Sequence, residues 1–460
     1  MKKINNILLF LILITMLSCS ESIKESVIVI ETVQNISSEK VKVGKNSKYF
    51  SPKIMDDHLK FSINLTKSDY YHLTIDDFSI DIILKPGDSI YISKEFINNR
   101  NKSFSGKGAL LNNYILNDKL YSDEINNSID FDSIYSMSSL KFINSIDSIY
   151  GQRNVRFEKF IASEKISNEL FISLERKRVL YEASIEKNLY YRDHKFLTGQ
   201  KPIIDKEFNS FHEKIDLNDS AILHLESYRN FLYTYFESKA LQLKDLSNDN
   251  PLFTELAFEN VINNISNPKI MSYVLYRIMD VHLNETSVNE LGNLIDEFNK
   301  SCLNDIYKEK INNYYSRLEK LKLGMPAPNF TFPDNNGQNI SLKDFVGKLV
   351  YIDVWNSLCS PCFKEFPLLE QLIEKYKGQE IVFIGISYDS NQQLWKKTIE
   401  KKNLKGVQLF ANGWNSQFGK DYLVYSNPRF ILIDKDGNFI NAKAPRPSEN
   451  IEKIINAHIK

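Results

Sequence analysis

The chain is 460 residues long, enough for about three domains at roughly 150 residues each. Hydrophobic residues make up 42% and charged residues 25% of the sequence, which is typical of a folded chain with buried cores. Lys plus Arg and Asp plus Glu both number 58, so the net charge is zero and a nucleic-acid partner, which favours a basic patch, is not indicated. The 7 histidines include no pair at metal-ligand spacing, so we expect no metal site, and we expect no cofactor.

The N-terminal segment predicts export from the cytoplasm. Two lysines precede an apolar run at residues 7–17, which is shorter than the ~20 residues of a membrane-spanning helix but fits a signal peptide. Residues 1–18 are therefore predicted to be a signal peptide of the lipoprotein type, because Met16–Cys19 resembles a bacterial lipobox whose cysteine is lipidated. The alternative is an ordinary cleaved signal with an incidental Cys19. Either leader implies a cell-envelope location, where disulfide chemistry is permitted.

Glycine and proline usage divides the rest of the chain. The segment from residue 110 to residue 320 contains only Gly151, Gly199 and Gly292, whereas most prolines lie at or beyond Pro326. We predict three parts, which are a β-rich domain at 26–106, a helical region at 110–320 and a C-terminal domain at 324–460.

The first part is predicted to be an antiparallel β domain. Its β-branched and aromatic residues favour strands, which we place at residues 26–33, 59–65, 70–75, 78–84 and 89–93. The region also contains an aromatic-rich hairpin, a turn at Leu84–Asp88 and the segment Ser105–Gly108. In these features it resembles the small β domain of unknown function that often precedes bacterial envelope thioredoxin domains, a resemblance that implies no chemistry.

The middle region is predicted to be all-α. Apolar residues spaced three and four apart indicate one buried face of a helix, as at Leu225, Tyr228, Leu232, Tyr235 and Phe236. We interpret the many aromatic residues of this region as helix-packing core rather than as a ligand site. Cys302 lies on a similar apolar stripe, so we interpret it as a small buried hydrophobic residue.

Beyond Gly324, predicted strands alternate with predicted helices, which indicates a mostly parallel sheet with helices on its faces. Residues 349–355 form an apolar strand interrupted only by Asp353, and a helix is expected from Cys359 to about Tyr376. The pair Cys359 and Cys362 therefore falls where a central strand runs into a helix.

This position decides between two interpretations of the C-x-x-C motif. It could be half of a zinc site, but no second Cys or His pair follows, and at a strand-to-helix junction it indicates a redox pair. A helix N-terminus favours the thiolate, which attacks disulfides, so we expect Cys359 to be partly exposed with a pKa below the ~8.5 of a free thiol. Cys362 lies one turn further on, where it can resolve a mixed disulfide. The alternative is a structural disulfide.

The C-terminal part resembles the membrane-tethered, thioredoxin-like disulfide reductases of the TlpA/ResA type over about residues 324–460. The motifs that carry the resemblance are Gly324–Phe330, Val354–Trp355, Cys359–Cys362 and Ser426–Phe430. The resemblance implies a thioredoxin-like α/β fold, protein or peptide thiols and disulfides as substrates, and a membrane electron donor. Leu358 and Ser360 replace the usual Trp and Gly, which leaves the reduction potential and the substrate surface open.

The resemblance also implies roles for single residues. Cys359 is the attacking thiol and Cys362 the resolving thiol of a redox-active disulfide. Pro428 is the cis-proline of a loop that docks the substrate, and we group Asn427 and Trp355 with it. Asp353 occupies the place of the buried acid of cytoplasmic thioredoxins, and we predict that it accepts the proton of Cys362. The alternatives are a hydrogen-bonded structural acid for Asp353 and a trans loop proline for Pro428.

These patterns predict a thiol-disulfide oxidoreductase of the cell envelope that acts as a reductase. One alternative is a thiol peroxidase, because the opening Ala327–Phe330 is shared with peroxiredoxins. Those enzymes need Pro and Thr or Ser seven and three residues before the reactive cysteine, where this chain has Ile352 and Asn356. The other alternative is a non-enzymatic envelope protein whose N-terminal two-thirds binds a partner.

Overall fold

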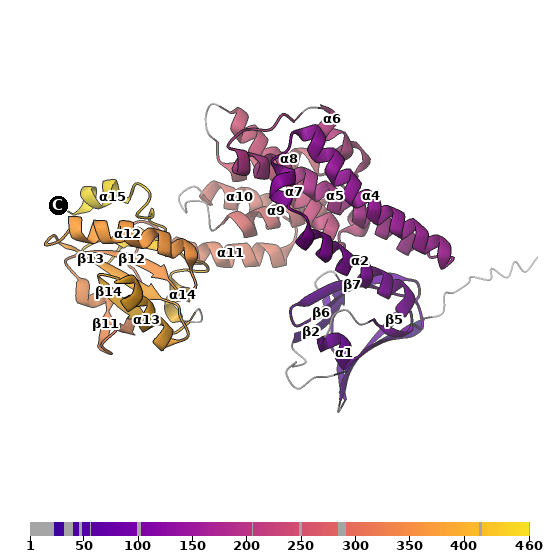
Figure 1. Cartoon of the computed structure of the whole chain (residues 1–460), viewed down its shortest axis with the longest axis horizontal. Helices are drawn as coiled ribbons and strands as arrows, with labels where there is room; N and C mark the ends of the chain where they lie inside the picture. Colours follow the sequence, from indigo (N-terminus) through magenta and orange to yellow (C-terminus); the bar gives the residue numbers. More distant parts are fainter. Residues whose placement is uncertain are drawn as a thin grey trace, which may run out of the picture. The chain divides into compact units, whose positions relative to one another are not determined.

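The computed structural model (Figure 1) divides the chain into two compact units, residues 1–270 and residues 271–460. The structure describes residues 23–31, 40–45, 48–55, 57–98, 103–204, 206–247, 251–283, 291–413 and 416–459. The predicted signal peptide at 1–18 and the predicted lipidation site Cys19 lie outside these ranges. None of the helices described is long and apolar enough to cross a membrane.

The first unit begins with two β-sheets. Their strands are β1 (Lys24–Glu31), β2 (Val41–Lys45), β3 (Lys48–Phe50), β4 (Lys53–Met55), β5 (His58–Leu65), β6 (Asp69–Ile75), β7 (Phe78–Leu84), β8 (Ser89–Ile92) and β9 (Ser105–Lys107). The sheet orders are β4-β5-β1-β8-β9 and β3-β2-β6-β7. The predicted antiparallel fold is confirmed for every strand pair but β1 and β8, which run parallel. Strand β5 buries alternate residues, as a half-buried strand must.

Helices follow in the rest of this unit, as predicted beyond residue 110, but the short helix Lys94–Asn98 lies within the segment predicted to be β-rich. They are α1 (Lys94–Asn98), α2 (Ala109–Ser128), α3 (Phe131–Tyr135), α4 (Ser139–Ser163), α5 (Glu169–Thr198), α6 (Lys206–Asn209), α7 (Glu226–Leu246) and α8 (Phe253–Asn264). Helix α9 (Pro268–His282) contains the division between the units. The apolar stripe predicted at 225–236 is buried along α7, with Tyr235 half-buried. The finer boundaries at 26–106, 110–320 and 324–460 remain a prediction.

A buried ionic network joins three helices of the first unit. The Arg153 side chain on α4 and the Asp118 side chain on α2 are only 1% and 2% exposed, and their N–O distance is 2.6 Å. Arg178 on α5 binds the same carboxylate at 2.6 Å. Burial raises the pKa of Asp118, but Arg178 and Arg153 outweigh burial and hold it below its usual value. The network therefore stabilises the helices only while both partners of each pair are present.

We predict that Arg153→Met lowers the free energy of unfolding by about 3 kcal/mol, because it removes one of two cations from a buried carboxylate. The matched control is Arg176→Met, whose pair with Glu158 is exposed and contributes about 0–1 kcal/mol. Urea unfolding followed by circular dichroism measures both values. Equal losses for the two variants would contradict this account of the network.

The second unit contains the predicted α/β domain. Its strands are β10 (Thr331–Pro333), β11 (Asn339–Ser341), β12 (Leu349–Trp355), β13 (Ile381–Ser387), β14 (Val407–Phe410), β15 (Arg429–Ile433) and β16 (Phe439–Asn441). Its further helices are α10 (Leu291–Ser301), α11 (Asp305–Glu319), α12 (Ser360–Lys375), α13 (Gln392–Lys402), α14 (Gln417–Asp421) and α15 (Ile451–His458). The main sheet has the order β14-β13-β12-β15-β16, and β10 and β11 form a separate hairpin that was not predicted.

Strand β12 is the centre of the main sheet. It pairs in parallel with β13 and antiparallel with β15, and all seven of its residues are buried. Leu349 and Tyr351 pack in one core with residues of α12 and α15, which lie along one side of the sheet in Figure 1. Because side chains alternate along a strand, Asp353 belongs to the same face as these two residues. The fold therefore places a buried acid on the helix-covered side of the sheet.

Candidate active site

Cys359 caps the N-terminus of helix α12. Its sulfur accepts a hydrogen bond from the backbone N–H of Cys362 at 3.2 Å. Pro361 lies in the first turn, where its missing N–H costs no helical hydrogen bond. The helix begins at Ser360, so the predicted start at Cys359 was one residue early, and the cysteine lies at the cap itself. A sulfur at this position faces the free N–H groups that stabilise a thiolate.

Cys359 and Cys362 form a disulfide with their Cα atoms 5.3 Å apart, so the structure shows the oxidised pair. Both cysteines pack in a cluster with Trp355 and Phe366, and Cys359 is only 6% exposed, which is less than we predicted. Cys362 has no exposed surface. A partner can therefore approach the pair only from the Cys359 side. Cys302, the free cysteine of the described residues, is buried as predicted.

Asp353 lies in the apolar interior with only 2% of its surface exposed. Burial raises the pKa of Asp353 to about 8, and the negative charge of Glu365 adds to the rise. Glu365 lies on α12 and accepts hydrogen bonds from the backbone N–H and the hydroxyl of Ser448, at 3.0 and 2.7 Å. Glu365 was not predicted as part of the site. Its place on the buried face of α12, one turn beyond Cys362, is the signal that could have revealed it.

The loop before Cys359 is held by a second buried acid that was not predicted. Asp389 follows strand β13 and accepts hydrogen bonds from the backbone N–H of Ser357 at 3.1 Å and from its hydroxyl at 2.8 Å. The Ser387 hydroxyl donates to the same carboxylate at 2.7 Å. These bonds fix the segment that leads into the cap of α12. An acid directly after a buried strand was the available signal in the sequence.

The predicted substrate-binding residues lie at the same edge of the sheet. Asn427 and Pro428, joined by a cis peptide bond, directly precede strand β15. Because Arg429 pairs with Val354, this loop lies next to the end of β12 that leads to Cys359. Trp355 packs against the disulfide and is fully buried, so a direct contact with substrate is not available to it in this state. The binding roles of all three residues remain predictions.

A C-x-x-C pair at the cap of the helix that follows the central strand of such a sheet defines a thiol-disulfide oxidoreductase of the thioredoxin-like class. The Redoxin family model matches residues 322–457. The thiol-disulfide oxidoreductase ResA of Bacillus cereus is 35% identical over 143 residues, which cover 31% of this chain and 82% of that protein. ResA of Bacillus thuringiensis is 34% identical with the same coverage.

The chain is also similar to solved structures. The thioredoxin domain of a thiol-disulfide oxidoreductase from Bacteroides vulgatus is 29% identical, with a TM-score of 0.29, and covers 30% of this chain and 99% of that one. Through its C-terminal part, the chain belongs to the ResA family of thiol-disulfide oxidoreductases. It is therefore a thiol-disulfide oxidoreductase.

We predict that Asp353→Asn stabilises the second unit at neutral pH. The pKa of this carboxyl rises from 3.8 to about 8 on folding, so between these values the folded state binds one more proton than the unfolded state. Stability is then lost as pH rises through this window, by roughly 4 kcal/mol at pH 7. The Asn variant should escape this loss and match the wild type near pH 4. Urea unfolding followed by tryptophan fluorescence tests this, and parallel pH profiles would contradict it.

Proposed function

We propose that the protein is a disulfide reductase of the cell envelope in which Cys359 is the nucleophile and Cys362 the resolving thiol. The observation that carries this proposal is the asymmetry of the pair. The Cys359 sulfur lies at the helix cap and accepts the N–H of Cys362, while Cys362 is sealed in the cluster behind it. An attacking thiol needs a stabilised thiolate and access, whereas a resolving thiol needs only to reach its neighbour.

In the proposed cycle, the Cys359 thiolate attacks a substrate disulfide and forms a mixed disulfide, and the released substrate thiolate takes a proton from solution. Cys362 then gives its proton to Asp353 in its ionised form and attacks the sulfur of Cys359. The bond between Cys359 and the substrate breaks, and the second substrate sulfur leaves as a thiolate that takes a proton from solution. The substrate strand docks along Asn427 and Pro428, with Trp355 supporting the disulfide from below. A membrane electron donor returns the disulfide to the dithiol.

The reducing direction and the location rest on the sequence. Pro361 matches the dipeptide of thioredoxin, and no histidine lies between the two cysteines. The N-terminal pattern supports export and a lipid anchor at Cys19, which would hold the protein on a membrane facing an oxidising compartment. A reductase there needs electrons from across that membrane, which supports the proposed donor.

We predict that Cys362→Ser accumulates covalent adducts with disulfide-bonded substrates. Without the resolving thiol the mixed disulfide on Cys359 cannot be released internally, so the adducts should survive on gels and collapse on addition of dithiothreitol. Insulin reduction should be abolished in this variant and retained in the control Cys302→Ser, whose thiol is buried in another part of the unit. Adducts that form equally well on Cys359→Ser would refute the assignment of the nucleophile.

We predict that Cys19→Ser releases the protein from the membrane fraction or leaves its leader uncut, because the lipid is attached through this thiol. Membrane fractionation and mass spectrometry of the mature N-terminus give the readout. An unmodified N-terminus at another residue of the wild type would rule out lipid anchoring.

A further inference from the structure

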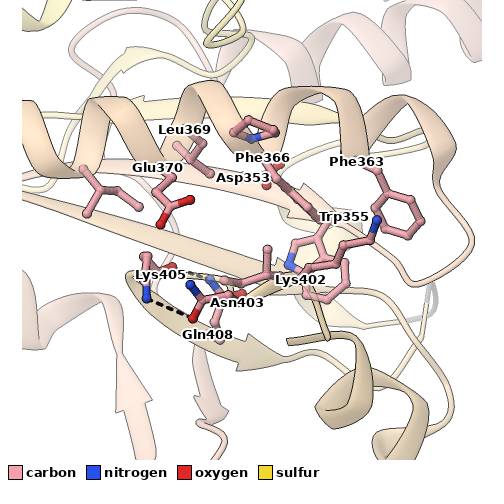
Figure 2. Close-up of a pocket in the computed structure, with 13 residues that line it drawn as sticks. Asp353, Trp355, Phe363, Phe366, Leu369, Glu370, Lys402, Asn403, Lys405 and Gln408 are labelled. Atoms are coloured by element: carbon pink, nitrogen blue, oxygen red, sulfur yellow. Dashed lines mark hydrogen bonds between the residues drawn. The ribbon is translucent and has the colours of Figure 1, made fainter. Parts of the chain in front are cut away.

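A pocket of about 150 Å³ leads from the protein surface to the buried acid Asp353. In Figure 2, side chains of helix α12 face those of residues 402–408 across this pocket. Its outer lining includes the exposed residues Glu370, Lys402 and Lys405, and its inner lining includes Asp353 and Gln408. None of the lining residues belongs to the loop around Pro428 where substrate is proposed to dock. The pocket therefore reaches Asp353 from another side.

Three buried polar atoms without a hydrogen-bond partner in the described structure belong to residues that line this one pocket. They are Oδ1 of Asp353, Nε1 of Trp355 and Oε1 of Gln408. Buried polar atoms are rarely left unpaired, and water supplies the missing partner where the site is polar and roomy enough. A water needs about 30 Å³, so this pocket can hold several. The indole N–H can donate to water, and both oxygens can accept from it.

Gln408 reaches toward Asp353 because Gly385 has no side chain. Asp353 pairs in register with Gly385, and Gly385 pairs in register with Gln408, so the three residues form one row across β12, β13 and β14. A Cβ atom on Gly385 would lie 2.3 Å from Oε1 of Gln408. The amide oxygen thus occupies the place of a side chain on Gly385, whose strand is one spacing of ~4.8 Å from the strand of Asp353. The Gln408 Nε2 group is held by the Lys405 carbonyl at 2.7 Å, which fixes the amide orientation.

We propose that this pocket is a water-filled passage through which Asp353 exchanges its proton with solvent, and that Gln408 is the residue that positions the water. The inference rests on the proposed role of Asp353 as proton acceptor. If the passage works in this way, the proton taken from Cys362 can leave through the pocket while a substrate covers the disulfide. The enzyme can then complete resolution before the product departs.

The proton balance is complete within the proposed cycle. Cys362 loses its proton to the Asp353 carboxylate and becomes the thiolate that forms the bond to Cys359. Asp353 passes the proton to the first water, which hydrogen-bonds to Oε1 of Gln408, and the last water releases it at the mouth. The substrate thiolate takes up a proton from solution, so no oxidant beyond the substrate disulfide is needed.

Charged and titratable groups surround Asp353 on several elements. Glu365 and Glu370 lie on α12, Tyr351 precedes Asp353 on β12, and Lys402 and Lys405 border the mouth. Lys405 donates to the Asn403 side chain at 2.9 Å, and Lys402 lies over the Phe363 ring at 4.6 Å, so both amines are held at the rim. Substitution of Lys402 or Lys405 should alter the rate of resolution less than substitution of Gln408.

The test is the rate of the resolving step, measured by stopped-flow tryptophan fluorescence from pH 6 to 9 in H₂O and D₂O with the full chain. Gln408→Met keeps the side-chain length but removes the amide. It should slow resolution about tenfold near pH 7 and enlarge the solvent isotope effect, while the reduction potential stays unchanged. Gln408→Glu, which can again hold water through an oxygen, should restore much of the rate. Gln393→Met, on the exposed face of α13, is the matched control and should behave as the wild type.

A double substitution separates this inference from the function on which it rests. In Asp353→Asn, the proton no longer passes through the carboxyl, so adding Gln408→Met should cause no further slowing. The proposed proton passage would be overturned if Gln408→Met left the rate of resolution and its isotope effect unchanged. It would also be overturned if Gln408→Met slowed resolution equally in the wild type and in the Asp353→Asn background. A wild-type protein that does not reduce insulin would instead overturn the proposed function. An unchanged rate of resolution in Asp353→Asn would overturn the role of Asp353 as proton acceptor.

Discussion

The junction between strand β12 and helix α12 determines where every group of the site lies. The strand is buried on both faces and ends at Trp355, and four residues later Cys359 caps the helix that begins at Ser360. This short connection directs the sulfur at the free N–H groups of the first turn, where a thiolate is favoured. The bonds from Ser357 to Asp389 hold the connection in place. The first turn of the helix then places Cys362 in the core. The strand-to-helix junction therefore gives the two thiols their different surroundings.

Asp353 is the costly element of this arrangement. Oδ1 of Asp353 has no hydrogen-bond partner among the described residues, so this carboxyl destabilises the fold once it ionises in its apolar strand, and the same burial raises the pKa of Asp353. The site also places Glu365 close enough to raise this pKa further. A buried acid that lowers stability is explained if it moves a proton, and the pocket that Asp353 lines gives that proton a route to solvent. Gly385 belongs to the same explanation, because a side chain there would displace the Gln408 amide from its position.

Sequence periodicity and motif position predicted the strand at 349–355, the helix that follows it and the location of the cysteine pair, because each depends on local residue patterns. The β10–β11 hairpin was missed, since its three-residue strands carry too little pattern to be recognised. Glu365, Asp389 and Gln408 were missed for a different reason. Their importance comes from neighbours distant in the sequence, such as Ser448 for Glu365 and Gly385 for Gln408, and such pairings exist only once the sheet has formed.

We propose that the pair of Cys359 and Cys362 works as a reductant, and the reduction potential of the pair is the most direct test. Trp355 packs against the disulfide, so its fluorescence can report the oxidation state during equilibration with dithiothreitol or glutathione buffers at pH 7. We predict a potential near that of thioredoxin, about −270 mV. A value near −120 mV, as for a strong oxidant, would contradict it.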